Sequence, residues 1–222
     1  MKKTKLLTTL GAVALIGAIG IGSTFAYLTS ETGTVKNTFT VGNVKIDLKE
    51  SKVVKNSQGQ YVDDDEADTW TVTENKYENL IPGDEMVKDP TVIVEKSEVL
   101  ANVFVAVKLG GENGWTYDSV NRKFVSKDFT TDAVDGDWTY YTAKSNNTVA
   151  VFYQENVDTK ADKKGLTLFS KVTYAANATN ATVPKAPAAL EIRAAAVQAG
   201  NLTLATGYDE ISAKLLAFAT AN

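Results

Sequence analysis

The sequence predicts an all-β protein, an antiparallel jelly-roll-like β-sandwich with a cleavable signal peptide before it and a short helix near the C-terminus. Three observations support this fold class. Apolar and polar residues alternate over many short segments, polar turns containing Gly and Asn separate these segments, and no helical pattern lies between them. Many short strands joined by turns are typical of a sandwich.

The first 26 residues have the three parts of a secretory signal peptide. Three lysines give a basic start, an apolar run follows over 10–21, and the small residues Thr24 and Ala26 stand third and first before an expected cut. Cleavage by a signal peptidase after Ala26 would make Tyr27 the new N-terminus. A retained membrane anchor is the alternative, but the polar segment 29–37 offers no stop-transfer pattern.

The chain is acidic, and processing would make it more so. It carries 23 Lys and Arg against 27 Asp and Glu, and loss of the three N-terminal lysines changes the net charge from −4 to −7. No basic cluster offsets this balance, which argues against a nucleic-acid partner. The mature chain, residues 27–222, fits one domain with a sizeable core.

Cysteine and histidine are both absent from the sequence. Disulfides, Ser-His-Asp triads, cysteine nucleophiles and the usual zinc sites are therefore excluded. We expect no enzyme activity, no cofactor and no metal site. A secreted chain without disulfides suits a Gram-positive exterior, where burial or self-assembly must hold it together.

The strands are predicted from period-two patterns. Val44, Ile46 and Leu48 alternate with charged residues, as in a strand with one buried face. The run 103–107 is apolar on both faces, which favours a central strand covered on both sides. Further predicted strands lie at 70–77, 92–94, 138–142, 148–153, 166–174 and 190–197, the last in an Ala-rich stretch that is ambiguous between strand and helix.

One helix is predicted near the C-terminus. Its apolar face consists of residues at spacings of three and four, with Thr206 as a possible cap: Tyr208, Ile211, Leu215 and Phe218.

Two polar stretches are predicted to be loops, at 51–68 and 110–136. The first contains the acidic run Asp63–Asp68, which we interpret as a solvated hairpin tip. Calcium binding there is the alternative, although the run lacks the Gly and the spaced ligands of an EF-hand loop. The acidic residues of 132–137 are similarly interpreted as a turn.

The order of five segments resembles the TasA/camelysin (CalY) family of SipW-dependent secreted proteins, which form fibres of bacterial biofilm matrices. The segments are Gly22–Thr29 at the expected cut, Phe39–Leu48, Leu80–Asp84 with Lys88 and Asp89 after it, Leu100–Val107, and Leu190–Ala199. The resemblance covers nearly the whole chain and is loosest over 110–165.

The resemblance implies a jelly-roll domain that is exported through a dedicated signal peptidase and assembles outside the cell. In such fibres a freed N-terminal segment completes a sheet of the neighbouring subunit. The donor here would be residues 27–40, with Leu28, Val35 and Phe39 as its larger apolar side chains. The alternative is that 34–41 forms an ordinary first strand of its own domain.

We therefore expect a secreted or surface-bound homopolymer, with accessory matrix proteins as further partners. A non-polymerising adhesin or accessory fibre subunit is the alternative function. In that case Trp70, Trp115 and Trp138 could face a ligand, although core or edge packing is the more usual place for tryptophan in a sandwich. A camelysin-like metallopeptidase is disfavoured because a zincin needs histidine ligands.

Overall fold

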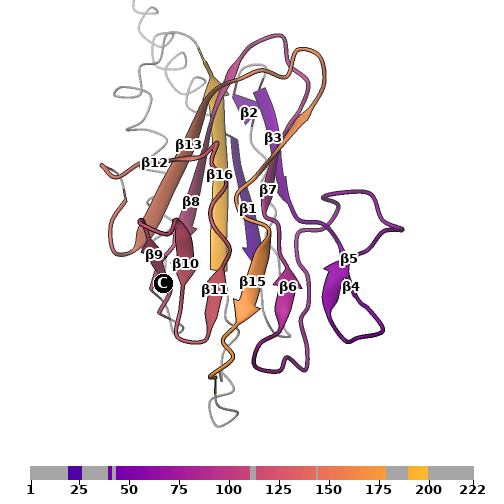
Figure 1. Ribbon diagram of the computed structural model, residues 1–222. Helices are drawn as coiled ribbons and strands as arrows, with labels where there is room; N and C mark the ends of the chain where they lie inside the picture. The colour runs from indigo at the N-terminus through magenta and orange to yellow at the C-terminus, as the bar shows by residue number, and fades with distance from the viewer. Residues whose placement is uncertain are drawn as a thin grey trace, which may run out of the picture.

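The computed structural model describes residues 20–26, 40–41, 44–110, 114–143, 145–178 and 190–199 (Figure 1). These residues form strands and connecting turns without any helix, so the all-β prediction is confirmed for this part of the chain. Within the same ranges nothing resembles a membrane-spanning helix. The predicted C-terminal helix lies outside the described residues.

A five-stranded antiparallel sheet forms one part of the fold. Its order is β1-β16-β8-β13-β12, with β1 and β12 at its edges. The strands are β1 (Gly20–Ala26), β16 (Leu190–Gln198), β8 (Ala101–Lys108), β13 (Val149–Val157) and β12 (Thr139–Tyr140).

Two further sheets complete the described fold. The four-stranded sheet contains β14 (Lys164–Thr167), β7 (Thr91–Val94), β3 (Val44–Lys49) and β2 (Thr40–Val41), in that order. The seven-stranded sheet contains β4 (Val53–Lys55), β5 (Tyr61–Asp63), β6 (Glu85–Val87), β15 (Lys171–Tyr174), β11 (Phe129–Thr131), β10 (Lys123–Val125) and β9 (Thr116–Asp118). Among the described strand pairs, β5 and β6 are parallel and the others antiparallel.

Strand β8 is buried on both faces, as its sequence predicts. It lies between β16 and β13. Its odd-numbered residues from Val103 to Val107 join the main core, which contains residues from all three sheets. Phe104 and Ala106 belong to a second buried cluster on the opposite face.

The Ala-rich segment at 190–198 is a strand, which confirms the prediction. Ala194, Ala195 and Ala196 stand opposite Val105, Phe104 and Val103 of β8. Small side chains beside large ones let the two strands pack, and this tertiary environment overrides the helix preference of alanine.

The tryptophans follow the core-packing prediction. Trp115 and Trp138 are buried, and Trp138 Nε1 donates a hydrogen bond to the Thr167 carbonyl oxygen at 2.9 Å. Trp70 is half-buried.

Several predictions of local structure are wrong. Both predicted loops contain strands: β4 and β5 lie within 51–68, and β9, β10 and β11 lie within 110–136, where Phe124 and Phe129 anchor them in the core. The predicted strand 166–174 is divided into β14 and β15, which belong to different sheets. The predicted strand 70–77 makes a single bridge, Val72 with Glu50, and Trp70 at its start has a positive φ of 55°. The acidic run 63–68 is not a hairpin tip: it begins at the last residue of β5 and continues after that strand, whereas the β4–β5 hairpin turns at 56–60.

Gly165 of β14 makes room for the Trp70 ring. A Cβ built at Gly165 would lie 2.3 Å from two ring carbons of Trp70, which is closer than atoms can approach. The Trp70 indole N–H in turn donates to Asp89 at 3.1 Å. The absence of a side chain at Gly165 therefore lets the Trp70 ring lie against β14.

We expect Gly165→Ala to displace the Trp70 ring and lower the free energy of unfolding by about 1–3 kcal/mol, as overpacking does elsewhere. Urea unfolding measures the loss, and acrylamide quenching of tryptophan fluorescence should rise as the ring becomes exposed. Gly136→Ala is the matched control, because nothing lies within 4 Å of a Cβ built there. Equal stability of the two variants would contradict the packing argument.

Candidate functional site

The structure places two of the six predicted site residues. Thr24 and Ala26, the small residues before the expected cut, stand opposite Ile192 and Leu190 in the β1–β16 pair. Tyr27, Leu28, Val35 and Phe39 lie outside the described residues, so their predicted roles in cleavage and strand donation remain predictions.

Strand β1 pairs with β16 along its whole length. The register is continuous from Gly20 opposite Ala196 to Ala26 opposite Leu190. Because β1 ends the order of its sheet, β16 is its one partner in that sheet, and β1 also contacts β3 of the four-stranded sheet. Figure 1 shows β1 running beside β16 at this edge.

The two faces of β16 have different surroundings. Leu190, Ile192, Ala194 and Ala196 belong to the main core. On the opposite face, Glu191 forms an ion pair with Lys108 of β8, in which Lys108 Nζ lies 3.2 Å from Glu191 Oε1. The strand next to β1 therefore carries a continuous row of buried apolar side chains on one side.

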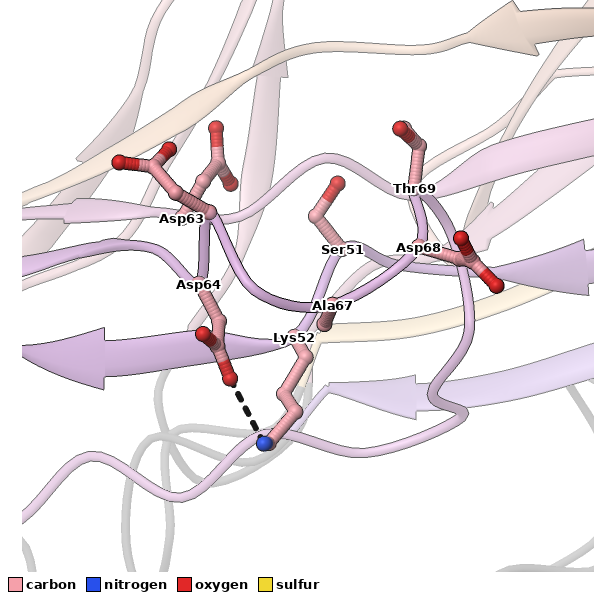
Figure 2. Close-up of a pocket in the computed structure, with 8 residues that line it drawn as sticks. Ser51, Lys52, Asp63, Asp64, Ala67, Asp68 and Thr69 are labelled. Atoms are coloured by element: carbon pink, nitrogen blue, oxygen red, sulfur yellow. Dashed lines mark ion pairs between the residues drawn. The ribbon is translucent and has the colours of Figure 1, made fainter.

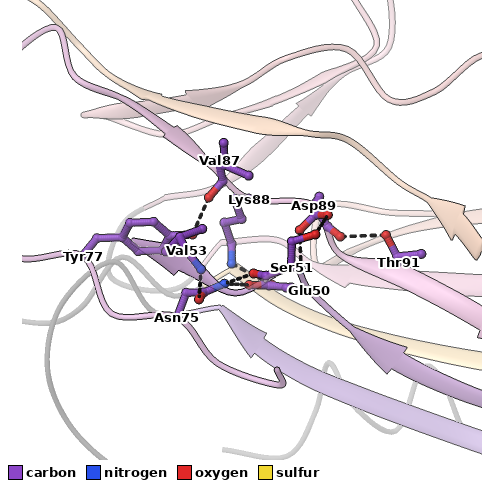
Figure 3. A network of polar contacts seen from close by, with 9 residues as sticks. All are labelled: Glu50, Ser51, Val53, Asn75, Tyr77, Val87, Lys88, Asp89 and Thr91. Atoms are coloured by element: carbon purple, nitrogen blue, oxygen red, sulfur yellow. Dashed lines mark hydrogen bonds and ion pairs between the residues drawn. The ribbon is translucent and has the colours of Figure 1, made fainter. Parts of the chain in front are cut away.

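A second candidate site is a buried polar network centred on one ion pair (Figure 3). Lys88 Nζ lies 2.8 Å from Glu50 Oε1, and the two side chains are 1% and 0% exposed. Asn75 donates to Glu50 Oε2 at 3.3 Å and to the Ser51 carbonyl at 2.8 Å, while its own side-chain oxygen accepts from the Val53 N–H. The network thus joins the end of β3, the segment before β4 and the segment after β6.

Asp89, the next residue after Lys88, receives three hydrogen bonds. The Ser51 N–H and hydroxyl donate to its two carboxylate oxygens at 2.8 and 2.7 Å, and the Trp70 indole donates at 3.1 Å. Burial nevertheless raises the pKa of Asp89, and the nearby negative charge of Glu50 adds to that rise, while the Ser51 hydrogen bonds act in the opposite direction.

Tyr77 is fully buried beside the ion pair. Its hydroxyl donates to the Val87 carbonyl oxygen at 2.5 Å. Burial, with the charge of Glu50 second, raises the pKa of Tyr77 well above its ordinary value. The phenol therefore stays protonated and serves as a fixed donor, not as a catalytic base.

Sequence reasoning missed this network, although one pattern pointed to it. Lys88 and Asp89 interrupt the apolar residues of β6 and β7, and two adjacent charges between buried strands usually need partners inside the fold. The partners Glu50 and Ser51 lie 38 residues earlier, and no local pattern connects them.

Most of the acidic run lines a pocket beside the network (Figure 2). Asp64 and Lys52, which both line this pocket, form an ion pair at 2.7 Å, and the hydrogen bond from Lys52 holds the pKa of Asp64 below its ordinary value. Burial raises the pKa of Asp63, with the negative charges of Asp89 and Asp65 adding to the rise. In the part of the chain that the structure describes, no three acidic residues converge as a metal site requires.

The acidic residues of the second predicted turn have structural partners. One Asp132 oxygen accepts from the N–H groups of Ser170 and Lys171, and Asp135 accepts from the Asp137 N–H. The Asp132 bonds hold this segment against the start of β15, and the Asp135 bond lies within the turn itself, in agreement with the turn interpretation.

Comparison of the chain with protein-family models, with curated proteins and with solved structures finds no match.

We expect Lys88→Met to lower the free energy of unfolding by about 3–5 kcal/mol, because it leaves the Glu50 carboxylate buried and unpaired. Adding Glu50→Gln should recover part of this loss, since the amide oxygen still accepts from Asn75 while no charge remains buried. Urea unfolding of both single variants and the double variant measures the coupling.

Lys52→Met is the control for that series, because it makes the same change in an ion pair whose lysine is exposed to solvent, and it should alter stability less than Lys88→Met. Additive losses at positions 50 and 88 would contradict the pairing.

The raised pKa of Asp89 gives its contribution to stability a definite pH dependence. A raised pKa means that the folded state holds the proton more tightly than the unfolded state. The contribution is therefore complete below the ordinary pKa of 3.8 and is lost as pH rises through the folded value. Relative to Asp89→Asn, the natural protein should gain stability as pH falls from about 7 to about 4.

Asp64→Asn provides a control of opposite sign. The pKa of Asp64 is lowered by Lys52, so its contribution is present above the ordinary pKa and is lost on acidification. Urea unfolding at several pH values measures both trends. The same trend for both variants would refute this assignment.

Proposed function

We propose that this protein is a secreted structural subunit that assembles into extracellular fibres of a bacterial biofilm matrix by N-terminal donor-strand exchange. The observation that carries the proposal is the place of β1. It fills the edge of a sheet beside β16 and ends at Ala26, the residue before the expected cut. Processing at that bond would separate this edge strand from the domain.

The order of family-like segments supports the same function. Leu80–Asp84 forms the turn before β6, with a positive φ at Gly83, and Lys88 and Asp89 after it belong to the buried network. The segment 100–107 is the buried strand β8, and 190–199 supplies its neighbour β16. The two matched segments at 100–107 and 190–199 therefore supply adjacent buried strands, whereas Leu80–Asp84 is a partly exposed turn.

A jelly-roll sandwich is the architecture we propose for the domain 27–222. The main core, to which all three sheets contribute, is compatible with two packed layers, and the network at Lys88 joins strands of two sheets. The proposed donor is 27–40, with Leu28, Val35 and Phe39 as its apolar contacts, and the proposed localisation is the cell surface or extracellular matrix.

Head-to-tail strand donation is a heterologous contact, which extends into a filament when it does not close into a ring. Each subunit would give its N-terminal segment to one neighbour and receive a segment from another. Such assembly needs no disulfide, cofactor or enzyme activity, and backbone hydrogen bonds supply most of the contact.

Electron microscopy of the purified mature chain, starting at Tyr27, tests the function. We expect fibres from this chain and monomers from a chain that starts at Gly42. Because the shorter chain also loses β2, the matched control keeps every residue but shuffles the order of 27–39.

If all three proteins form fibres, the structural role would stand, but the contact between subunits would lie outside the N-terminal segment. Monomers from all three would overturn the proposal and favour the accessory or adhesive alternative.

A further inference from the structure

The edge of the five-stranded sheet beside β16 is occupied by residues that the mature protein would lack. All seven residues of β1 precede the expected cut after Ala26, and all seven pair with β16. Cleavage would therefore remove one whole strand, not part of one. The backbone groups of Leu190–Ala196 that face β1 would lose their partners together.

Removal of β1 would also uncover part of the main core. Leu190, Ile192, Ala194 and Ala196 share that core with Val44, Ile46 and Leu48 of β3, and β1 contacts both strands. An edge with unpaired backbone groups and adjoining apolar side chains is a template for an added strand.

The composition of β1 makes it a weak occupant of this edge. Residues directly opposite in an antiparallel pair lie on the same face of the sheet. The positions opposite the four core residues of β16 are Gly20, Gly22, Thr24 and Ala26. These residues offer little apolar surface, so a strand with larger residues at alternate positions would bury more.

We propose that β1 is a temporary intramolecular cap on an acceptor edge at Leu190–Ala196, and that after processing this edge binds the N-terminal segment of a second copy of the chain. This inference rests on the proposed function, and it adds the acceptor site and the control of its exposure. The uncleaved chain would be unable to accept a strand even when it is free of the membrane.

The register disfavours the simplest refilling of the edge by the subunit's own N-terminus. To fill all seven positions beside β16 with residues that follow Ala26, the subunit's own chain would have to move along β16 by at least seven residues. The smallest such movement puts Glu31 opposite the buried Ile192. Burying that charge without a partner is costly. A second copy is not restricted to this register. In its segment 33–39, Val35 and Phe39 are four residues apart and would share one face of an extended strand, with Asn37 between them.

The choice of 33–39 also leaves the donor's own β2 in place. Thr40 and Val41 pair with Lys45 and Val44 of β3, directly after this segment. Each subunit would keep that anchor while its preceding residues reach a neighbour.

Hydrogen exchange of the full-length uncleaved chain, purified in detergent micelles, tests the cap. In an edge strand only alternate N–H groups face the neighbouring strand, and proline is tolerated at the others. We therefore compare the natural chain with two double variants. One places proline at odd-numbered positions of β1 (Ile21→Pro with Ser23→Pro), and the other places it at even-numbered positions (Gly22→Pro with Thr24→Pro).

We expect one of these variants to lose protection at alternate amides of Leu190–Ala196, while the other keeps it. Amides of β8 and β13 should stay protected in both variants, because neither strand touches β1 in the sheet. Unchanged protection of β16 in both variants would overturn the cap. Loss of protection throughout β8 and β13 would also overturn it, since β1 would then be an integral part of the fold.

A second experiment asks what binds the edge of β16 in the mature chain, and it uses a synthetic peptide with the sequence of residues 20–26. Added to the mature chain, it should slow fibre growth and protect alternate β16 amides, whereas a peptide of shuffled sequence should do neither. If β16 is fully protected in dilute mature monomer, its own N-terminus fills the edge and the second-copy assignment fails.

The two proposals fail separately. Absence of fibres would end the proposed function, while exchange in the uncleaved chain would still report on the cap. Fibres together with unchanged exchange in the proline variants would leave the function standing and remove the cap.

Discussion

The buried ion pair between Lys88 and Glu50 is the constraint on which much of the fold depends. Neither charge reaches solvent, so each is stable in the interior only while the other is in place. Glu50 follows β3 of the four-stranded sheet and Lys88 follows β6 of the seven-stranded sheet. The pair therefore fixes how these two sheets meet, which nonspecific apolar packing would specify less well.

Around this pair, polar groups hold segments that lack regular structure. Asn75 and Tyr77 lie in a stretch without strand pairing, yet both are buried because their side chains bond to backbone carbonyls of neighbouring segments. Asp89 similarly holds Ser51 and Trp70. Side-chain hydrogen bonds here replace the backbone ladder that a regular strand would supply.

The strands that sequence could predict are those whose burial leaves a local pattern. Val44–Leu48 shows period-two alternation and Val103–Val107 is apolar throughout, and both are strands with the predicted burial. The loop prediction for 110–136 failed because β9, β10 and β11 have three residues each, which is too short for a period-two pattern to be recognised. The polar network escaped prediction because Glu50 and Lys88 depend on contacts across 38 residues.

The β1–β16 pair could not be predicted for the same reason, since it joins residues 20–26 to 190–196. A signal-peptide pattern indicates an address and a cleavage point, and it gives no cause to expect pairing with the rest of the chain. Yet the strand ends at the residue where the pattern places the cut. If cleavage of the bond after Ala26 both releases the protein and empties a sheet edge beside its core, then one event completes export and makes the subunit able to assemble. No separate trigger would then be needed to keep subunits apart before they leave the cell.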